Sequence, residues 1–424
     1  MSSILTNTSA MVALQTLRGI NSNLSKTQDE ISTGKSIATA RDNSAVWAIS
    51  KVMESDVKGF KAISDSLSLG QSTITVARSA AETVTDLLTE IKGKIVAAQE
   101  DNVDRTKIQT DIVALRDQIN SVVNAAQFNG LNLLSNTSST AGSGAVSVLS
   151  SLDRNASGTV TASHISVNKH DLGTAAQAVD AAGTYAAGSG GAAGTLNAAQ
   201  SASLTVASVT AGTAYSIGLT GTDADSSAFV PATYTTSGDV AGASQITYVA
   251  RDGDTAADVA NALASAYATY AAENGLDTNV LNFTANGSSL VATSGATDGT
   301  DTIAVRIDTV AGNNTVGGGL AALADVDVSS AASAEAALAA VEGLIQTAID
   351  ASAEFGSAQG RIDIQSDFVS KLTDSLKAGI GTLVDADMEE ASARLQALQV
   401  QQQLGIQSLS IANQQPQSIL ALFR

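Results

Sequence analysis

The two ends of the chain carry similar patterns of apolar residues, and the long middle does not. Near the N-terminus, Leu14, Leu17, Leu24 and Ile31 repeat at steps of three and four residues, with Asn21 and Gln28 at polar positions of the same stripe. Near the C-terminus the same spacing recurs, with interruptions at Gln402 and Gly405, in a stripe of Val384, Met388, Ala391, Leu395, Leu398, Leu409 and Ala412. Such stripes form narrow seams on helices that need a partner helix. We therefore expect the two ends to pair with each other and with neighbouring copies.

A longer stripe predicts a helical bundle next to these ends. It keeps the same spacing through Ile74, Ala77, Ala81, Val84, Leu88, Ile91, Ile95 and Ala98. The polar run 100–104 predicts a turn, and Ile108 to Ala126 predicts a second helix that folds back on the first. Asn129 and Gly130 favour a tight hairpin turn directly after it. Helix is predicted again from about Ser333 to Leu376, with a joint at Gly379 and Gly381, where glycine weakens a helix by about 1 kcal/mol relative to alanine.

The middle of the chain, residues 136–330, differs from the two ends in composition and in the pattern of its apolar residues. It contains many Gly and Thr residues and four alternating segments that predict strands, SLTVASV, AYSIGLT, QITYVAR and DTIAVRID. Thr255 and Asp258 form a capping-box-like start for one helix. The fold class is therefore mainly α, with an inserted α+β domain. The two helical ends of the chain are predicted to pair as a coiled coil or helical bundle.

Composition narrows the possible functions. The formal net charge is −19, and residues 136–330 alone contain sixteen acidic but only four basic residues. Such a surface repels phosphate backbones, so we expect no nucleic-acid partner. There is no Cys, which excludes disulfides and thiolate chemistry. The N-terminus lacks the pattern of a cleaved signal peptide, and no stretch approaches the length of a membrane span.

The sequence contains only weak candidates for a metal-binding or catalytic site. His164 and His170 are the only histidines, no HExxH occurs, and zinc needs more ligands than these two. Asp252, Gly253 and Asp254 could suggest calcium, but the further ligands of a calcium loop are absent, and a turn before a helix is the better interpretation. Trp47 is interpreted as a packing anchor. We expect no enzyme activity, no cofactor and no metal.

Four segments resemble bacterial flagellin. They are LRGINSNLSKTQDEISTGKSIATARDNSAVWAIS near the start, QFNG and FGSAQGRID within the helical parts, and the ending ANQQPQSILALFR. The resemblance covers about residues 1–135 and 331–424. It implies a structural subunit that is exported and polymerises into the extracellular flagellar filament for swimming motility.

The resemblance also implies a layered organisation. Residues 1–42 and 383–424 would form the inner coiled-coil layer of a hollow filament. Residues 43–135, with the QFNG hairpin, and 331–382 would form a helical rod, and residues 136–330 would be a surface-exposed insert. The expected assembly interface comprises Leu14, Leu17, Leu24, Ile31, Val384, Met388, Leu395, Leu398 and Leu409.

Partners are implied in the same way. They are further copies of the chain, sister flagellins, the flagellar export apparatus, an export chaperone at the C-terminal region, and hook-associated and cap proteins. Flagellins that the animal innate flagellin receptor senses carry an Arg-x-Arg-Glu element, and the aligned positions here are Lys92, Gly93, Lys94 and Ile95. Because lysine cannot reproduce bidentate arginine contacts, we expect weak receptor activation.

Two other functions stay open. A hook–filament junction protein would have the same helical ends but would not polymerise indefinitely. A secreted adhesin or enzyme would use the insert as its working part.

Overall fold

The computed structural model describes residues 7–155, 157, 159–191, 193–197, 199–224, 231–236, 246–295 and 301–422. The chain divides into two compact units. The first comprises Met1–Asp65, Arg154–Val160 and Ser366–Arg424, and the second comprises Ser66–Asp153 and Thr161–Gln365. Two long helices, α2 (Ser44–Ala98) and α5 (Ala331–Val384), contribute residues to both.

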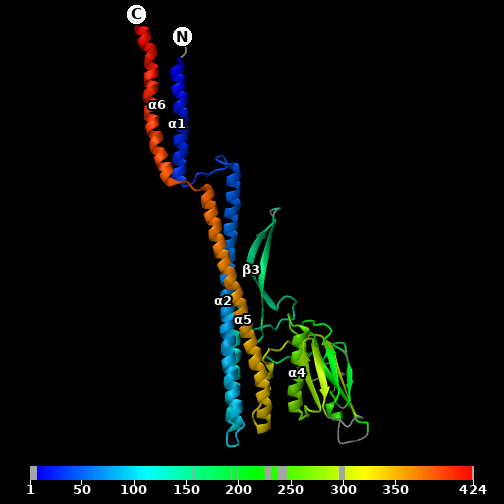
Figure 1. Ribbon diagram of the computed structural model, residues 1–424. Helices are drawn as coiled ribbons and strands as arrows, with labels where there is room; N and C mark the ends of the chain where they lie inside the picture. The colour runs from blue at the N-terminus through cyan, green and yellow to red at the C-terminus, as the bar shows by residue number, and fades with distance from the viewer. Residues whose placement is uncertain are drawn as a thin grey trace. The chain divides into compact units, whose positions relative to one another are not determined.

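In the first unit, helix α1 (Thr8–Thr33) packs along helix α6 (Met388–Leu422), and the first turn of α1 and the last turn of α6 lie at the same end of this pair (Figure 1). The Asn7 side chain caps α1 by accepting a hydrogen bond from the Ala10 N–H at 3.0 Å. Helix was predicted for the whole of residues 1–42, of which residues 1–6 lie outside the described part of the chain. The prediction was wrong at the C-terminal end. The helix ends at Thr33 because Gly34 adopts a left-handed conformation, with φ of 70°.

The segments that leave α1 and enter α6 are joined by backbone hydrogen bonds. The Ser36 N–H donates to the Val384 carbonyl at 2.7 Å, and the Ala386 N–H donates to the Gly34 carbonyl at 3.0 Å. The predicted joint at Gly379 and Gly381 was wrong, because α5 continues through both glycines and ends at Val384. A Cβ atom at Gly379 would lie 3.2 Å from Cε of Met53, so this glycine permits close packing rather than ending the helix.

The second unit contains the regular helical bundle. All eight residues of the predicted stripe between Ile74 and Ala98 are buried, which confirms that stripe as the core face of α2. Helix α3 (Arg105–Ala125) folds back as predicted, and its first residue donates from Nε to the Ala98 carbonyl at the end of α2 at 2.8 Å. An ion pair of 2.6 Å joins Lys92 of α2 to Glu342 of α5.

Two hairpins follow α3. Strands β1 (Gln127–Phe128) and β2 (Leu131–Asn132) pair around Asn129 and Gly130, whose φ angles of 51° and 80° confirm the predicted turn. Strands β3 (Ala145–Arg154) and β4 (Val160–Asn168) form a second pair that the sequence did not predict. Val148 of β3 packs against Gly70 of α2, where a Cβ atom would approach the valine methyl groups to 2.8 Å.

The α+β domain is built from antiparallel strands and one long helix. In its larger sheet the order is β5 (Thr184–Ala186), β12 (Thr302–Ala311), β8 (Ala214–Thr222) and β9 (Thr247–Val249), with β6 (Gly194–Leu196) also paired to β12. A smaller sheet has the order β10 (Leu281–Asn286), β11 (Ser289–Ser294) and β7 (Ser201–Thr205). Short 3₁₀ helices occur at Pro231–Tyr234 and Ala321–Ala324.

Helix α4 (Ala256–Glu273) packs against strands of both sheets and completes the apolar core of this domain. Its predicted capping box is confirmed, with the Thr255 N–H donating to Asp258 Oδ2 at 2.7 Å and the Asp258 N–H donating to Thr255 Oγ1 at 3.3 Å. Strands β8, β9 and β12 confirm the predicted strands in AYSIGLT, QITYVAR and DTIAVRID, whereas β7 ends at Thr205 and covers only the first three residues of SLTVASV.

Candidate assembly surface

The seam between α1 and α6 is a regular heptad on both helices. On α6, buried and half-buried positions recur at steps of four and three, at Ala391, Leu395, Leu398, Gln402, Gly405, Leu409 and Ala412. On α1 the corresponding positions are Ala10, Ala13, Leu17, Ile20, Leu24, Thr27 and Ile31. This spacing keeps one stripe of each helix facing the other along the whole contact.

Small residues let the two helices approach closely. A Cβ atom at Gly405 would lie 3.2 Å from Cδ1 of Leu17 and 3.8 Å from Cδ1 of Ile20. The leucine and isoleucine side chains therefore occupy the space that a side chain at position 405 would need. Gly405 is not a defect in the apolar stripe, because it is the point where α1 side chains insert.

Polar contacts fix the register of the pair. The Gln402 side chain donates from Nε2 to Asn21 Oδ1 at 2.8 Å, and Asn7 donates from Nδ2 to the Ala412 carbonyl at 2.8 Å. Asn21 itself lies on the exposed border of the seam. A hydrogen bond that holds only in one register specifies the alignment of two otherwise similar apolar stripes.

The structure brings most of the predicted interface residues to this seam. Leu398 is buried, and Leu17, Leu24, Ile31, Leu395 and Leu409 are half-buried between the helices. Val384 is buried but lies outside the seam, because it is the last residue of α5 and its carbonyl accepts the Ser36 N–H beyond the end of α1. Leu14 and Met388 lie outside the seam, with 40% and 44% of their surface exposed. Ala13, Ile20 and Thr27 occupy seam positions that the predicted stripe did not include, because that stripe gave priority to large apolar residues.

A second set of apolar side chains on the same helices has no partner within the described part of the chain. We call this set, with Leu14 and Met388, the outward apolar residues. It includes Met11 and Val12 on α1, and Val400, Leu404, Ile406 and Ile411 on α6, each more than half exposed. Burying one such side chain fully is worth about 1.5–3 kcal/mol, so their exposure disfavours the isolated chain. Apolar groups on two faces of each helix are typical of helices that contact more than one neighbour.

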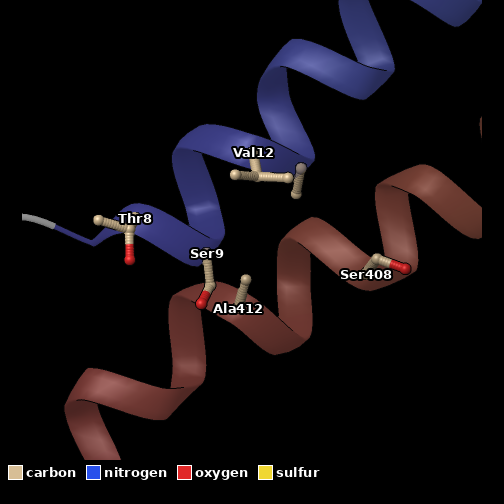
Figure 2. Close-up of a pocket in the computed structure, with 6 residues that line it drawn as sticks. Thr8, Ser9, Val12, Ser408 and Ala412 are labelled. Atoms are coloured by element: carbon tan, nitrogen blue, oxygen red, sulfur yellow. The ribbon is translucent and has the colours of Figure 1, made fainter. Parts of the chain in front are cut away.

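The α1–α6 pair also leaves a hollow near the chain ends. A cavity of about 460 Å³ lies among Thr8, Ser9, Val12, Ala13, Ser408 and Ala412. Figure 2 shows Ser9 and Ala412 directed toward each other across it, with Val12 on the α1 side. Every lining residue is small or apolar and none is titratable. The hollow is wide open to solvent, and its lining offers no acid, base or nucleophile of high reactivity.

Perturbed carboxyl groups in this unit have local causes. The Asp42 carboxylate accepts hydrogen bonds from the N–H and Oγ1 of Thr39, at 2.9 and 3.0 Å, and these hold its pKa below the ordinary value. The hydrogen bond from Lys51 lowers the pKa of the Glu54 carboxyl in the same way. Both groups stabilise turns and helix surfaces, and neither faces the hollow or the seam.

The candidate ligand residues of the second unit are engaged in structural contacts. Asp252 Oδ2 accepts the Gly144 N–H at 2.6 Å, and Asp254 Oδ2 accepts the Arg251 N–H and the Tyr248 hydroxyl, at 2.7 and 2.6 Å. These contacts form the turn before α4. His164 is exposed, while His170 stacks edge-on against Phe355 with ring centroids 5.3 Å apart.

The positions aligned with the receptor element lie on α2. The ammonium group of Lys92 binds Glu342, and that of Lys94 binds Asp111 on α3, each at 2.6 Å. Gly93 is exposed with open space around it, whereas Ile95 is completely buried. Only three of the four positions can therefore contact another protein directly.

Comparison with known proteins identifies the chain. The model of the bacterial flagellin N-terminal helical region matches residues 4–139, and that of the C-terminal helical region matches residues 338–423. Flagellin A of Rhizobium meliloti is 37% identical over 430 residues, with 100% of both chains covered. The chain belongs to the bacterial flagellin family. Flagellin FljK of Caulobacter vibrioides is 30% identical over 427 residues, covering 100% of this chain and 99% of the relative.

Solved structures were matched at lower identity. Flagellar hook associated protein-3 from Legionella pneumophila has a TM-score of 0.35 and 10% identity, covering 78% of this chain and 98% of that protein. FliC from Burkholderia pseudomallei has a TM-score of 0.30 and 16% identity, covering 69% of this chain and 99% of that protein. Membership of the flagellin family accounts for the confirmed fold class, with helical ends and an inserted α+β domain.

Proposed function

We propose that this flagellin-family chain is a structural subunit that polymerises into the bacterial flagellar filament. The observation that carries the proposal is the set of outward apolar residues on α1 and α6, which the α1–α6 pair leaves exposed. Stacking several copies covers those residues on more than one side. The role is mechanical, because the seam and the hollow beside it contain no group suited to catalysis.

The proposed layering follows the chain. Residues 1–42 and 383–424 form the inner coiled-coil layer, residues 43–135 and 331–382 form the helical rod, and residues 136–330 face the solvent. Two contacts of the middle region with the rod helices determine which of its residues a deletion variant must keep. Val148 packs on Gly70, and Gln109 donates from Nε2 to the Val326 carbonyl at 3.0 Å. The β3–β4 hairpin and residues 326–328 thus support the rod helices.

The remaining partners are inferred from the family. We place the assembled chain outside the cell in the flagellum, after passage through the flagellar export apparatus, with an export chaperone on the C-terminal region beforehand. Hook-associated and cap proteins would contact the ends of the filament, and sister flagellins could share it. No helix in the described ranges is long and apolar enough to cross a membrane.

Assembly of purified chain tests the function. We expect dissociated chain to extend filament seeds into filaments of indefinite length, visible by electron microscopy. A hook–filament junction protein would instead stop after forming a short assembly, and a stalk-borne adhesin or enzyme would stay unpolymerised. Either of those results contradicts the proposal.

A shortened variant tests the layering in the same experiment. The Leu320 N–H donates to the Gly173 carbonyl at 2.9 Å, so a few glycine residues can join these positions in place of residues 174–319. This cut keeps β3, β4 and residues 326–328. We expect the shortened chain to form thinner filaments, and recovery of soluble monomer alone would count against the layered organisation.

Weak receptor activation is the second expectation that family membership raises. Lys92 and Lys94 are held by Glu342 and Asp111, and the Lys94 pKa is raised by its hydrogen bond to Asp111. A lysine that is already bound to a carboxylate cannot give another protein the two parallel hydrogen bonds that an arginine guanidinium group provides. Purified monomer should activate a reporter cell line far more weakly than a flagellin that carries Arg-x-Arg-Glu. Equal potency of the two proteins would refute this expectation.

A further inference from the structure

The described part of the chain contains three methionines, and they lie in different environments. Met11 on α1 and Met388 at the start of α6 belong to the outward apolar residues, with 66% and 44% of their surface exposed. Met53 on α2 is half-buried and covers Gly379 of α5, where a Cβ atom would lie 3.2 Å from its Cε atom. The two most exposed thioether groups therefore both lie on the helices of the candidate assembly surface.

These sulfur atoms can be oxidised by a hydroperoxide. Because the chain has no cysteine, the methionine sulfurs are its most easily oxidised groups. A lone pair on sulfur attacks one peroxide oxygen, so that a sulfur–oxygen bond forms as the oxygen–oxygen bond breaks. The proton of the transferred hydroxyl group passes to the departing hydroxide, which leaves as water. The sulfur loses two electrons, the peroxide gains them, and the product is methionine sulfoxide.

Oxidation changes what these positions offer to a neighbouring molecule. A methionine thioether is apolar and flexible, and it fits irregular apolar contacts well. The sulfoxide oxygen is polar, and burying it without a hydrogen-bond donor is unfavourable. Leu14, one turn further along α1, is itself one of the outward apolar residues and has no donor in its side chain. A surface that was apolar at Met11 thus acquires an acceptor that must be desolvated in any contact.

The same oxidation leaves the seam between α1 and α6 untouched. Met11 and Met388 lie outside the seam, and the polar contacts that fix its register, from Gln402 to Asn21 and from Asn7 to the Ala412 carbonyl, do not involve either side chain. An effect of oxidation at Met11 and Met388 is therefore an effect on contacts between copies, and not on the pairing of the two helices within one copy.

We propose that hydroperoxide oxidation of Met11 and Met388 to the sulfoxide weakens the joining of dissociated chain to a filament. The inference rests on the proposed function, in which neighbouring copies cover the outward apolar residues. Oxidation acts on the dissociated chain, because these sulfurs are covered once a copy has joined. The effect is reversible, since methionine sulfoxide reductases, one for each sulfoxide epimer, restore the thioether.

The experiment treats dissociated full-length chain with hydrogen peroxide and removes the excess with catalase. Peptide mass spectrometry follows each methionine, and sulfoxide should appear at Met11 and Met388 before Met53, in the order of their exposure. Seeded assembly gives the concentration needed for polymerisation, expressed as the ratio of treated to untreated chain. This ratio should be about ten, a modest cost for burying an unpaired polar group. A thiol-driven mixture of both reductases should return it to unity.

Two variants assign the effect to the exposed sulfurs. Met11→Leu with Met388→Leu removes both exposed thioethers, so the treated-to-untreated ratio of this chain should stay close to unity. Met53→Leu is the matched control, because it conserves volume and leaves both exposed sulfurs in place. Its ratio should match that of the unaltered chain.

Three results would overturn the proposal. They are an equal ratio for the double variant and the Met53→Leu chain, oxidation of Met53 ahead of both exposed methionines, and treated chain that assembles as well as untreated chain. Failure of untreated chain to extend seeds is a separate result. It would contradict the proposed function, and the assembly effect inferred from it would be wrong as well.

Discussion

Leu398→Asp is expected to abolish filament formation. Leu398 lies at the centre of the α6 stripe with 8% of its surface exposed, between Leu395 and Gln402. The substitution removes an apolar side chain worth about 1.5–3 kcal/mol of burial and places an unpaired carboxylate in its position. Leaving a charge without a partner in a buried site costs roughly 3–5 kcal/mol, and every copy in a filament repeats that cost.

The measurement is seeded assembly followed by electron microscopy, with circular dichroism of the dissociated chain as a second readout. Leu398→Met is the matched variant, because it conserves volume and apolar character and should lower assembly only slightly. The rod helices do not depend on position 398, so the helical signal of the dissociated Leu398→Asp chain should stay close to that of the unaltered chain. Filaments of normal yield from Leu398→Asp would show that the seam is not required for assembly.

Gly405→Val is expected to raise the concentration of chain needed for polymerisation by at least about tenfold. The first carbon of the new side chain would already lie 3.2 Å from the Leu17 methyl group, and the two valine methyl groups need further space. Overpacking of a closely packed contact costs about 1–3 kcal/mol, and a cost of about 1.4 kcal/mol, in the lower part of that range, already corresponds to a tenfold change. The two helices must move apart or Leu17 must leave the seam.

Gly19→Val separates this effect from the change in helix propensity. Gly19 also lies inside a helix, on α1, and a Cβ atom there meets no other atom within 4 Å. Both substitutions change the intrinsic helix preference equally, so only Gly405→Val should impair α1–α6 pairing. Pairing can be followed in the assembled filament by its resistance to heat, which should fall for Gly405→Val. A Gly405→Val filament as heat-resistant as the unaltered one would contradict the close-approach interpretation.

The sequence predicted the α6 seam more accurately than the α1 seam, and the reason is local. On α6 two apolar stripes with the same spacing also overlap, but the one with three leucines, Leu395, Leu398 and Leu409, forms the seam, while Ala397, Val400, Leu404 and Ile411 stay exposed. On α1 two overlapping heptads share Leu17, Leu24 and Ile31, and one contains Leu14 and Asn21 while the other contains Ala13 and Ile20. Large residues favoured the first, but the structure uses the second. Which of the two α1 heptads faces α6 depends on Gly405 of α6, where Leu17 and Ile20 insert. The spacing of residues within α1 alone contains no information about that contact.

Some strands that were not predicted nevertheless had a turn dipeptide or an alternation of apolar and polar residues in the sequence. The β10–β11 hairpin has an Asn286-Gly287 dipeptide at its turn, the same signal that correctly placed the hairpin at Asn129 and Gly130. Its alternation of Leu281, Phe283 and Ala285 with polar residues was also present. The β3–β4 pair depends on packing against α2, and no short-range pattern encodes that contact. The predicted helix joint at Gly379 was wrong for a related reason. This glycine permits a close contact with Met53 and does not end the helix.

The hydrogen bonds that close the α1–α6 seam join residues that are far apart in the sequence. Gln402 and Asn21 are 381 positions apart, and Asn7 and Ala412 are 405 apart. Contacts of such sequence separation carry a large loop-closure entropy and form late in folding. A chain in which α6 has not yet been synthesised has no partner helix for the seam of α1. On the proposed function, the order of synthesis therefore acts as a safeguard, since a polypeptide that lacks α6 cannot form the α1–α6 seam on which we expect assembly to depend.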